Sequence, residues 1–221
     1  MMRARGVSTR GRLLEAAYAE FHEQGFKSAR LSRILVRAGV TKGALYHHFP
    51  DKRALGVAVI DEAIGARIEA MWLTPLTLSK DAITGLLEVV GSRIASLDEE
   101  AVRLGCPLNN LISEMSAVDA TFQKHLQHIL MRWQNQLVAR LVTTRATGAL
   151  RDDVDCEAAA LFILSSWEGC WGIAKNMRSV KAFRACGQEL LRYIGSLAAT
   201  PLQPQNRAVA LGSPQYAHEH P

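Results

Sequence analysis

The chain of 221 residues is 48% apolar and 21% charged, a balance typical of a folded protein of one or two domains and not of a disordered one. No apolar run reaches the roughly 18 residues that a membrane-spanning helix needs, and the basic N-terminus leads into no apolar signal-peptide core. We therefore expect a cytoplasmic protein without a membrane partner.

Positive charge is concentrated at the N-terminus. Residues 1–53 contain eleven Lys or Arg and four Asp or Glu, a net charge of +7, whereas residues 54–221 carry a net charge of −2. A small basic region beside a near-neutral remainder is typical of a segment that meets a polyanion such as nucleic acid. Charge alone is equally compatible with a solvated basic surface, so the motifs must decide between the two.

Three helices are predicted in the first fifty residues. The first follows Ser8 or Thr9, both good N-caps, and ends at Gly25. A short second helix ends before Gly39, because glycine readily adopts the positive φ of a tight turn. Thr41 then caps a third helix, which runs to about residue 47.

Apolar residues recur at helical spacing through the rest of the chain, and no run alternates as a strand would. Pro50 breaks the chain, Asp51 caps a long fourth helix, and Pro75 with its neighbours in LTPLTLS, residues 73–79, ends that helix. Further helices are expected over about 83–97, 107–115, 119–148, 155–175 and 179–197. The prediction is an all-α fold of about nine helices, with one domain over residues 1–50, a larger domain over 51–197 and a flexible tail over 198–221.

The cysteines are dispersed. Cys106, Cys156, Cys170 and Cys186 form no CxxC pair and are too few for a disulfide framework. We expect reduced thiols that act as small apolar residues. Cys106 precedes a predicted helix start, a position that can activate a thiol, so redox or electrophile sensing by Cys106 stays open as an alternative.

Residues of about 30–49 have the pattern of a helix-turn-helix motif, in which two short helices are joined by a tight turn, here Arg37–Thr41. At 100° per residue, Leu45 and Phe49 share the face of the third helix that points toward Ile34. The outward face then carries Lys42, Gly43, Tyr46 and His47.

This outward face is unusual for a surface without a partner. A glycine such as Gly43 costs a helix about 1 kcal/mol relative to alanine. A DNA backbone explains the choice, because glycine lets the helix start approach phosphates, whose charge the helix N-terminus favours. Lys42 can neutralise a phosphate or reach a base edge, and Tyr46 and His47 can donate to phosphate oxygens. His47 and His48 point about 100° apart on a helix, which makes them a poor metal site.

The stretch GVTKGALYHHFPDKRAL, residues 39–55, resembles the signature of TetR/AcrR-type bacterial transcriptional regulators, and the resemblance covers residues 8–55. It implies a homodimer whose helix-turn-helix reads a near-palindromic operator in double-stranded DNA. It also implies a C-terminal ligand-binding and dimerisation domain, whose small, largely apolar effector releases the DNA. The expected protein is thus a repressor without a cofactor. The chain departs from the family pattern at Ala29 and Arg30, where Thr or Ser is usual, so Ser28 or Ser32 is expected to cap the second helix.

The motif and the resemblance together give a set of predicted DNA contacts. The residues predicted to contact DNA are Arg30, Arg33, Thr41, Lys42, Gly43, Tyr46, His47 and Lys52.

Two such motifs must enter successive major grooves about 34 Å apart, which requires a dimer. In the predicted helix that ends near residue 175, Glu157, Glu168 and Lys175 fall on one narrow stripe, and the remaining wide apolar arc is expected to be buried on two sides. The predicted dimer-interface residues are Phe162, Ile173, Phe183, Leu190 and Ile194.

Tryptophan and methionine residues are concentrated in the larger domain, where they fit either an ordinary core or a partly apolar cavity with a few polar groups. The predicted ligand-binding residues are Met71, Cys106, Asn110, Glu114, Trp133, Trp167 and Trp171.

Catalytic and metal motifs are missing from the sequence. It contains no phosphate-binding loop, GxSxG or HExxH motif, so we expect no enzyme. His125 and His128 have a spacing that permits metal binding, but no Cys, Asp or Glu flanks them at helical spacing, so no metal site is expected. Two alternatives to a ligand-responsive repressor stay open: an architectural DNA-binding protein with a fully packed C-terminal core and no ligand, and a redox-sensing repressor that uses Cys106.

Overall fold

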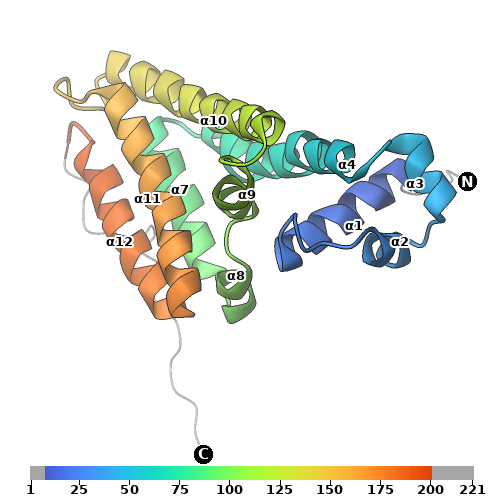
Figure 1. Cartoon of the computed structure of the whole chain (residues 1–221). Helices are drawn as coiled ribbons and strands as arrows, with labels where there is room; N and C mark the ends of the chain where they lie inside the picture. Colours follow the sequence, from blue (N-terminus) through green and yellow to red (C-terminus); the bar gives the residue numbers. More distant parts are fainter. Residues whose placement is uncertain (1–7, 201–221) are drawn as a thin grey trace, which may run out of the picture. The chain divides into compact units, whose positions relative to one another are not determined.

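The computed structural model describes residues 8–200, and their regular structure is helical apart from an isolated antiparallel bridge between Leu150 and Ala198 (Figure 1). The prediction of an all-α chain is confirmed. The chain forms two compact units. Unit 1 contains the described residues up to Ala70 together with Leu104–Arg132, and unit 2 contains Met71–Arg103 and the described residues from Trp133 onward. Most of the predicted tail lies outside the described residues.

Unit 1 begins with α1 (Thr9–Gln24), α2 (Leu31–Ala38) and α3 (Lys42–His48). Ser8 accepts a hydrogen bond from the backbone N–H of Gly11, and Thr41 accepts one from Ala44, so both act as the predicted N-caps. Gly39 has a φ of 63° and forms the left-handed turn between α2 and α3. The predicted helix-turn-helix is therefore confirmed.

Helix α2 receives its cap from a residue that the sequence did not indicate. The N-cap position is Arg30, which has no side-chain cap of its own, and the backbone N–H of Arg30 donates to Glu20 Oε1 at 3.3 Å. Glu20 belongs to α1 and is 1% exposed. The prediction that Ser28 or Ser32 caps this helix is wrong, because a buried carboxylate of the preceding helix takes that role.

The chain from Lys52 to Leu78 is helical throughout but alternates between α and π geometry. Its segments are α4 (Lys52–Ala58), η1 (Val59–Ile64), α5 (Gly65–Ile68), η2 (Glu69–Leu73) and α6 (Thr74–Leu78). Asp51 caps α4 as predicted, by accepting from the backbone N–H of Ala54 at 2.7 Å. The helix ends within the predicted stretch LTPLTLS, at Leu78 with Ser79 as its C-cap, and Pro75 itself lies in the first turn of α6, where its missing N–H is tolerated.

Unit 1 is completed by α9 (Pro107–Met115) and the first half of α10 (Ala120–Ala146). The ring of Phe122 is fully buried, and its centre lies 4.5 Å from the centre of the Phe26 ring, which follows α1. A Cβ on Gly56 of α4 would approach Phe122 Cζ to 2.6 Å and Phe26 Cε2 to 2.7 Å. Glycine at this position therefore lets α4 pack directly on the two rings.

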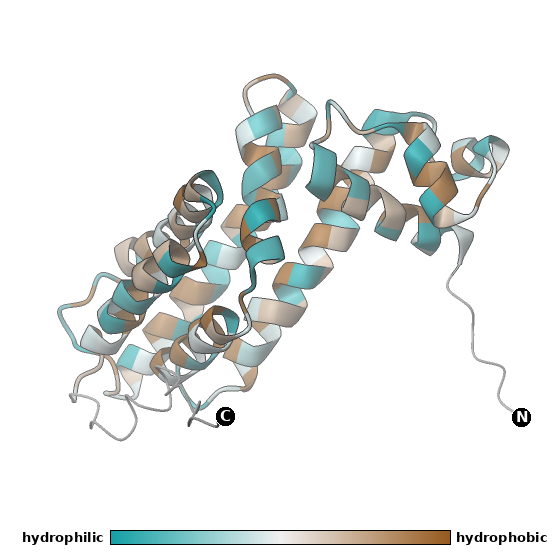
Figure 2. Cartoon of the chain, turned by 90° about the horizontal axis from the view of Figure 1, so that it is seen from below, coloured by the Kyte–Doolittle hydropathy of each residue, from teal (hydrophilic) through white to brown (hydrophobic). Residues whose placement is uncertain are grey.

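Unit 2 contains α7 (Ala82–Ala95), most of α8 (Glu99–Leu104), the second half of α10, α11 (Cys156–Met177) and α12 (Val180–Ser196). Hydrophobic and hydrophilic residues occupy different faces of these helices (Figure 2). The core residues Trp133, Trp167 and Phe183 are at most 3% exposed. The sequence analysis missed α8, although Asp98 signals its start by accepting from the backbone N–H of Ala101.

Two of the cysteines are not reduced thiols. A disulfide joins Cys170 of α11 to Cys186 of α12, with their Cα atoms 5.8 Å apart, while Cys106 and Cys156 are buried and take no part in it. The prediction of four thiols is wrong for this pair. The two cysteines lie at similar distances on either side of the turn at 178–179, so the helical hairpin places them opposite each other.

Candidate nucleic-acid interface

The outward face of α3 is open, as its periodicity predicted. Lys42, Gly43, Tyr46 and His47 are exposed, whereas Leu45 is 1% exposed. A Cβ on Gly43 would meet nothing nearer than Thr41 Oγ1 at 4.0 Å, so packing within the chain does not require glycine here. Lys42 Nζ lies 5.8 Å from the centre of the Tyr46 ring, within the range of a cation–π contact. Contact of these residues with DNA stays a prediction.

Two further predicted DNA contacts already have partners within unit 1. The Thr41 hydroxyl accepts from the backbone N–H of Ala44 at 3.2 Å. Lys52 Nζ donates to the Lys27 carbonyl at 3.2 Å and lies 4.9 Å from the centre of the Phe26 ring. Partial burial lowers the pKa of Lys52. One of the three N–H donors of the Lys52 ammonium is thus used within unit 1, and contact of Lys52 with DNA stays a prediction.

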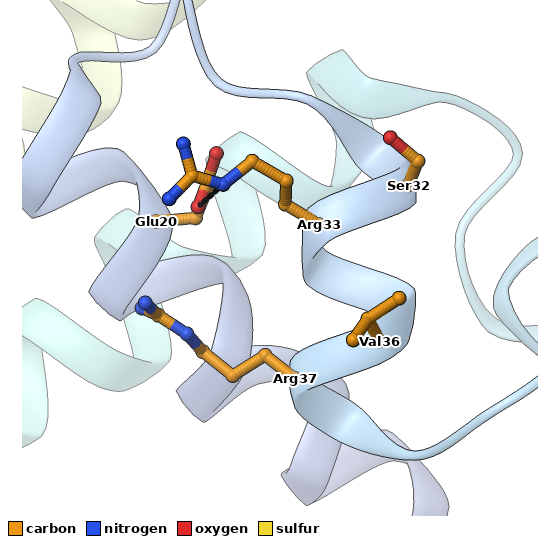
Figure 3. A pocket seen from close by; sticks show the side chains of 5 residues that line it. All are labelled: Glu20, Ser32, Arg33, Val36 and Arg37. Atoms are coloured by element: carbon orange, nitrogen blue, oxygen red, sulfur yellow. Dashed lines mark ion pairs between the residues drawn. The ribbon is translucent and has the colours of Figure 1, made fainter.

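A shallow hollow of about 460 Å³ lies between α1 and α2 and is lined by Glu20, Ser32, Arg33, Val36 and Arg37 (Figure 3). Arg33 Nε lies 3.3 Å from Glu20 Oε2, and Arg37 Nη2 donates to Glu23 Oε2 at 3.0 Å. Val36 between them is 83% exposed. The exposed side of α2 thus presents two arginines that carboxylates of α1 hold in place.

Arg12 supports the turn of the motif, a role that the sequence analysis missed. Its guanidinium donates to the carbonyl of Ala38, the last residue of α2, at 3.2 Å. Carbonyls at a helix C-terminus lack partners within the helix, and a cation there also interacts favourably with the helix dipole. Arg12 therefore stabilises the joint between α2 and α3 from α1, and no local motif reveals this contact.

Glu114 of α9 binds the loop between α1 and α2. Its carboxylate accepts hydrogen bonds from the backbone N–H groups of Phe26 and Lys27, both at 2.7 Å. Near the end of α1, His22 Nε2 lies 2.7 Å from the carbonyl oxygen of Gly105, which precedes α9. The two bonds that the Glu114 carboxylate accepts are charge-assisted, and bonds of this kind are among the stronger hydrogen bonds in proteins. The α1–α2 loop is thus held by a segment more than 75 residues further along the chain.

An ion pair makes a second such connection. Arg53 donates to both carboxylate oxygens of Asp119, at 2.7 and 2.8 Å, and to the Thr121 hydroxyl at 2.6 Å. The hydrogen bonds from Arg53 and from the backbone N–H groups of Phe122 and Thr121 hold the pKa of Asp119 well below its usual range. The start of α4 is thereby linked to the start of α10.

The predicted ligand-binding residues divide between the units. Cys106, Asn110 and Glu114 belong to unit 1, and Met71, Trp133, Trp167 and Trp171 belong to unit 2. The Asn110 amide is used within unit 1, where Nδ2 donates to the Leu104 carbonyl at 2.8 Å.

Four tryptophans form a continuous ring cluster in unit 2. The Trp72 ring centre lies 4.8 Å from that of Trp133 and 4.9 Å from that of Trp167, which in turn lies 6.0 Å from Trp171. Within the described residues, the buried Nε1 of Trp133 has no hydrogen-bond partner. Ligand binding by these residues stays a prediction.

The five predicted dimer-interface residues differ in exposure. Phe162 and Ile173 of α11 are 51% and 62% exposed, so they are accessible to a second copy. Phe183, Leu190 and Ile194 of α12 are at most 3% exposed and belong to the core of the subunit. Contact with a second copy stays a prediction for all five.

Residues 8–200 hold no group of three or more His, Cys, Asp or Glu side chains arranged to bind a metal ion. His125 Nδ1 lies 2.9 Å from Asp61 Oδ1, so this histidine is paired with a carboxylate of η1. Over the same residues, no helix is both long enough and apolar enough to span a bilayer.

Comparison with known proteins identifies both parts of the chain. Residues 13–59 match the family model of bacterial regulatory proteins of the tetR family, and residues 82–190 match that of the tetracyclin repressor-like C-terminal domain. The HTH-type transcriptional repressor DhaR of Mycobacterium sp. strain GP1 is 26% identical over 72% of this chain and 79% of its own length. The transcriptional regulator AcuR of Cereibacter sphaeroides is 29% identical over 71% and 72% of the two chains.

A solved structure agrees with these matches. The crystal structure of a TetR regulatory protein from Rhodobacter sphaeroides superposes with a TM-score of 0.73 at 26% identity, and covers 82% of this chain and 96% of its own. Proteins of this family are regulators and not enzymes. The chain therefore belongs to the TetR family of bacterial regulatory proteins, and it is a DNA-binding transcriptional regulator with a helix-turn-helix head.

Proposed function

We propose that this regulator is a ligand-responsive repressor, which binds a near-palindromic operator as a homodimer and is released by a small, largely apolar effector. The observation that carries the DNA-binding part is the open face of α3, where an exposed glycine without a packing role stands between Lys42 and Tyr46. A backbone without a side chain at this position lets phosphates approach the start of α3. The relative DhaR is a transcriptional repressor, which supports repression as the mode of action.

Exposed apolar side chains on α11 support the homodimer. Leu161, Phe162, Ile173 and Met177 are each more than half exposed, and they are named here the α11 face. Small exposed residues, Ser165, Gly169 and Gly172, lie between them along the helix. Exposed apolar side chains gathered on one helix are typical of an interaction site, and a two-fold axis would bring the same residues of a second copy against them.

The tryptophan cluster supports an effector site in unit 2. A buried donor without a hydrogen-bond partner, such as Trp133 Nε1, costs about 1–3 kcal/mol relative to a satisfied one. An effector with an acceptor atom and an apolar body would satisfy this N–H and pack against the neighbouring indole rings. This chemistry fits a small, largely apolar molecule that carries a carbonyl, ether or carboxylate oxygen.

The contacts of Glu114 supply a route within unit 1 for release of DNA. A shift of α9 would withdraw the carboxylate from the backbone N–H groups of Phe26 and Lys27. The α1–α2 loop would then lose its support, and with it the position of α2 in the motif. In this proposal the bound effector favours the arrangement in which these hydrogen bonds are broken.

The test begins with selection of bound DNA from a random pool by the full-length protein. We expect enrichment of a near-palindrome whose half-sites are one helical turn apart. In the salt dependence of operator binding, Lys42→Ala should lower the slope by about one unit per subunit. Lys124→Ala removes the same charge from an exposed position on α10 and should leave the slope unchanged. A pool without an enriched sequence would contradict operator recognition.

The effector and the dimer are tested on the same sample. A compound screen should yield apolar molecules that release the selected DNA, and sedimentation should give a dimer that Ile173→Asp converts to a monomer. If no compound releases the DNA while the operator is still recognised, the architectural alternative replaces the ligand-responsive one.

A further inference from the structure

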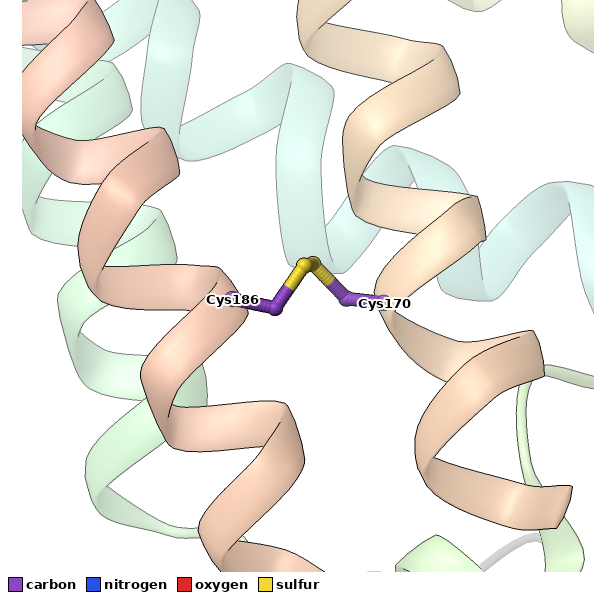
Figure 4. The surroundings of a disulfide bond; sticks show 2 residues. All are labelled: Cys170 and Cys186. Carbon is purple, nitrogen blue, oxygen red and sulfur yellow. A yellow bond between two sulfur atoms is a disulfide. The ribbon is translucent and has the colours of Figure 1, made fainter. Parts of the chain in front are cut away.

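The disulfide between α11 and α12 joins a buried residue to an exposed one. Cys170 is 1% exposed and lies among the core residues of unit 2, whereas Cys186 is exposed on α12 (Figure 4). The Cα separation of 5.8 Å is normal for a disulfide. Cys186 is therefore the end of the bond that a thiol in solution is expected to approach.

Ring contacts also hold α11 and α12 together beside the bond. The centre of the Phe183 ring of α12 lies 4.4 Å from that of Trp171 and 5.3 Å from that of Trp167, both of α11. These rings lie on the turns next to the disulfide. A bacterial regulator works where the chromosome is, in a compartment that keeps thiols reduced, and disulfides found there are usually transient and catalytic or redox-sensing. An accessible disulfide between helices that ring contacts also hold together fits reversible use better than permanent stabilisation.

We propose that Cys170 and Cys186 form a thiol–disulfide exchange site, which small dithiols reduce and small-molecule disulfides reoxidise. A thiolate of the dithiol attacks Sγ of Cys186 to form a mixed disulfide, and the Cys170 sulfur leaves with the bonding electron pair and takes up a proton. The second thiolate of the dithiol then displaces Cys186, which takes up another proton, and the reductant closes as a disulfide. Two electrons and two protons pass to the protein, and oxidation reverses each step.

The exchange acts on the surface that the proposed homodimer uses, so this part rests on the proposed function. Gly169 and Ile173 of the exposed side of α11 lie within one turn of Cys170, and Ala185 beside Cys186 is also exposed. Unbonded sulfurs must lie about 1.5 Å further apart than bonded ones. The bond thus holds α11 and α12 in a fixed register that a second copy meets preformed. Reduction removes this constraint and weakens the dimer and its hold on DNA.

Thiol counting tests the exchange site without reference to dimers or DNA. The full-length protein is equilibrated in mixtures of reduced and oxidised dithiothreitol of varied ratio, quenched in acid, alkylated under denaturing conditions and weighed by mass spectrometry. We expect two alkylated cysteines in oxidising mixtures, Cys106 and Cys156, and four in reducing ones. Two at every ratio would show a permanent disulfide, and four at every ratio would show that the bond does not form; either result overturns the proposal.

Sedimentation equilibrium in the two end mixtures tests the consequence. Oxidation should tighten the dimer by about fivefold or more, the lower end of typical couplings between sites. Cys186→Ser, at an exposed position, should abolish the response, and Cys170→Ser should do the same. Cys156→Ser and Cys106→Ser change cysteines outside this disulfide and should retain the response. Equal dimer affinities in both mixtures would overturn the regulatory part and leave the homodimer intact. A monomer in both mixtures would overturn the homodimer and its redox control. The thiol count would then decide the exchange site by itself.

Discussion

The long-range contacts inside unit 1 differ in kind from those inside unit 2. In unit 1, ion pairs connect helices that are far apart in sequence: Arg10 with Glu62, Arg67 with Glu15, Arg53 with Asp119 and Arg132 with Glu69. His125 lies within hydrogen-bond distance of Asp61. In unit 2, the corresponding long-range contacts are a chain of aromatic rings and a disulfide. Its ion pairs Arg151–Asp153 and Arg192–Glu189 are local.

This difference indicates how each unit responds to change. Exposed ion pairs are weak individually, so breaking one of them in unit 1 costs little free energy, whereas the contact of Phe26 with the buried Phe122 ring in unit 1 is of the same kind as those of unit 2. A buried aromatic cluster is close-packed, and its loss is costly. Single long-range polar contacts of unit 1 are therefore expected to cost less free energy to break than the aromatic contacts of unit 2.

The largest effect is expected from breaking the aromatic cluster. Trp167→Ala should destabilise the protein by about 3–5 kcal/mol, because Trp167 is 3% exposed and its ring contacts Trp72 and Phe183. Urea unfolding measures this loss. Leu78→Ala, at a position that is 81% exposed, is the control and should change stability by less than about 0.5 kcal/mol. A Trp167→Ala variant as stable as the control would remove the cluster as the main support of unit 2.

A smaller loss of stability is expected when a polar contact of unit 1 is weakened. Glu114→Gln should cost about 1–2 kcal/mol, because one amide oxygen replaces the carboxylate that binds the N–H groups of Phe26 and Lys27. Hydrogen exchange of these two amides should accelerate, while amides in the middle of α1 keep their protection. Glu88→Gln, at an exposed position of α7, serves as the matched control. Unchanged exchange at Phe26 and Lys27 would show that Glu114 does not hold the loop.

The smallest expected effect is the pH dependence of the stability that Asp119 contributes. Because the folded-state pKa of Asp119 is lowered by Arg53 and by backbone N–H groups, its contribution to stability is complete above its unfolded value of 3.8 and is lost as the pH falls below it. Asp119→Asn should therefore be slightly less stable than the parent at pH 7, and the difference should shrink below about pH 4. Denaturation midpoints at several pH values measure this, and a difference that grows on acidification would contradict the assigned pairing.

Local sequence signals predicted most helices and the recognition motif correctly, because caps and periodicity act over a few residues. Ser8, Thr41, Asp51 and Ser179 all cap the helices that follow them. Exposure of Lys42 and Tyr46 and burial of Leu45 follow from the same periodicity.

Contacts between distant segments could not be predicted in the same way. Glu20 as the cap of α2, Glu114 on the α1–α2 loop and the pairing of Cys170 with Cys186 each depend on how helices meet in space. For the cysteines, a signal was available, since two residues placed symmetrically about a helical turn come together in a hairpin. The roles of residues toward DNA, effector and a second copy depend on partners that the sequence does not contain.

The alternation of α and π geometry between Lys52 and Leu78 has a consequence for how this helix can change in evolution. A π turn accommodates one more residue than an α turn, so burial shifts along the chain: Ile68 and Met71 are half-buried, while Trp72, Leu73 and Leu76 are buried. Loss of one residue in η1 or η2 could convert that turn to α geometry without disturbing the side chains on either side. The two π segments therefore act as places where the helix can gain or lose a residue and keep both of its ends in phase.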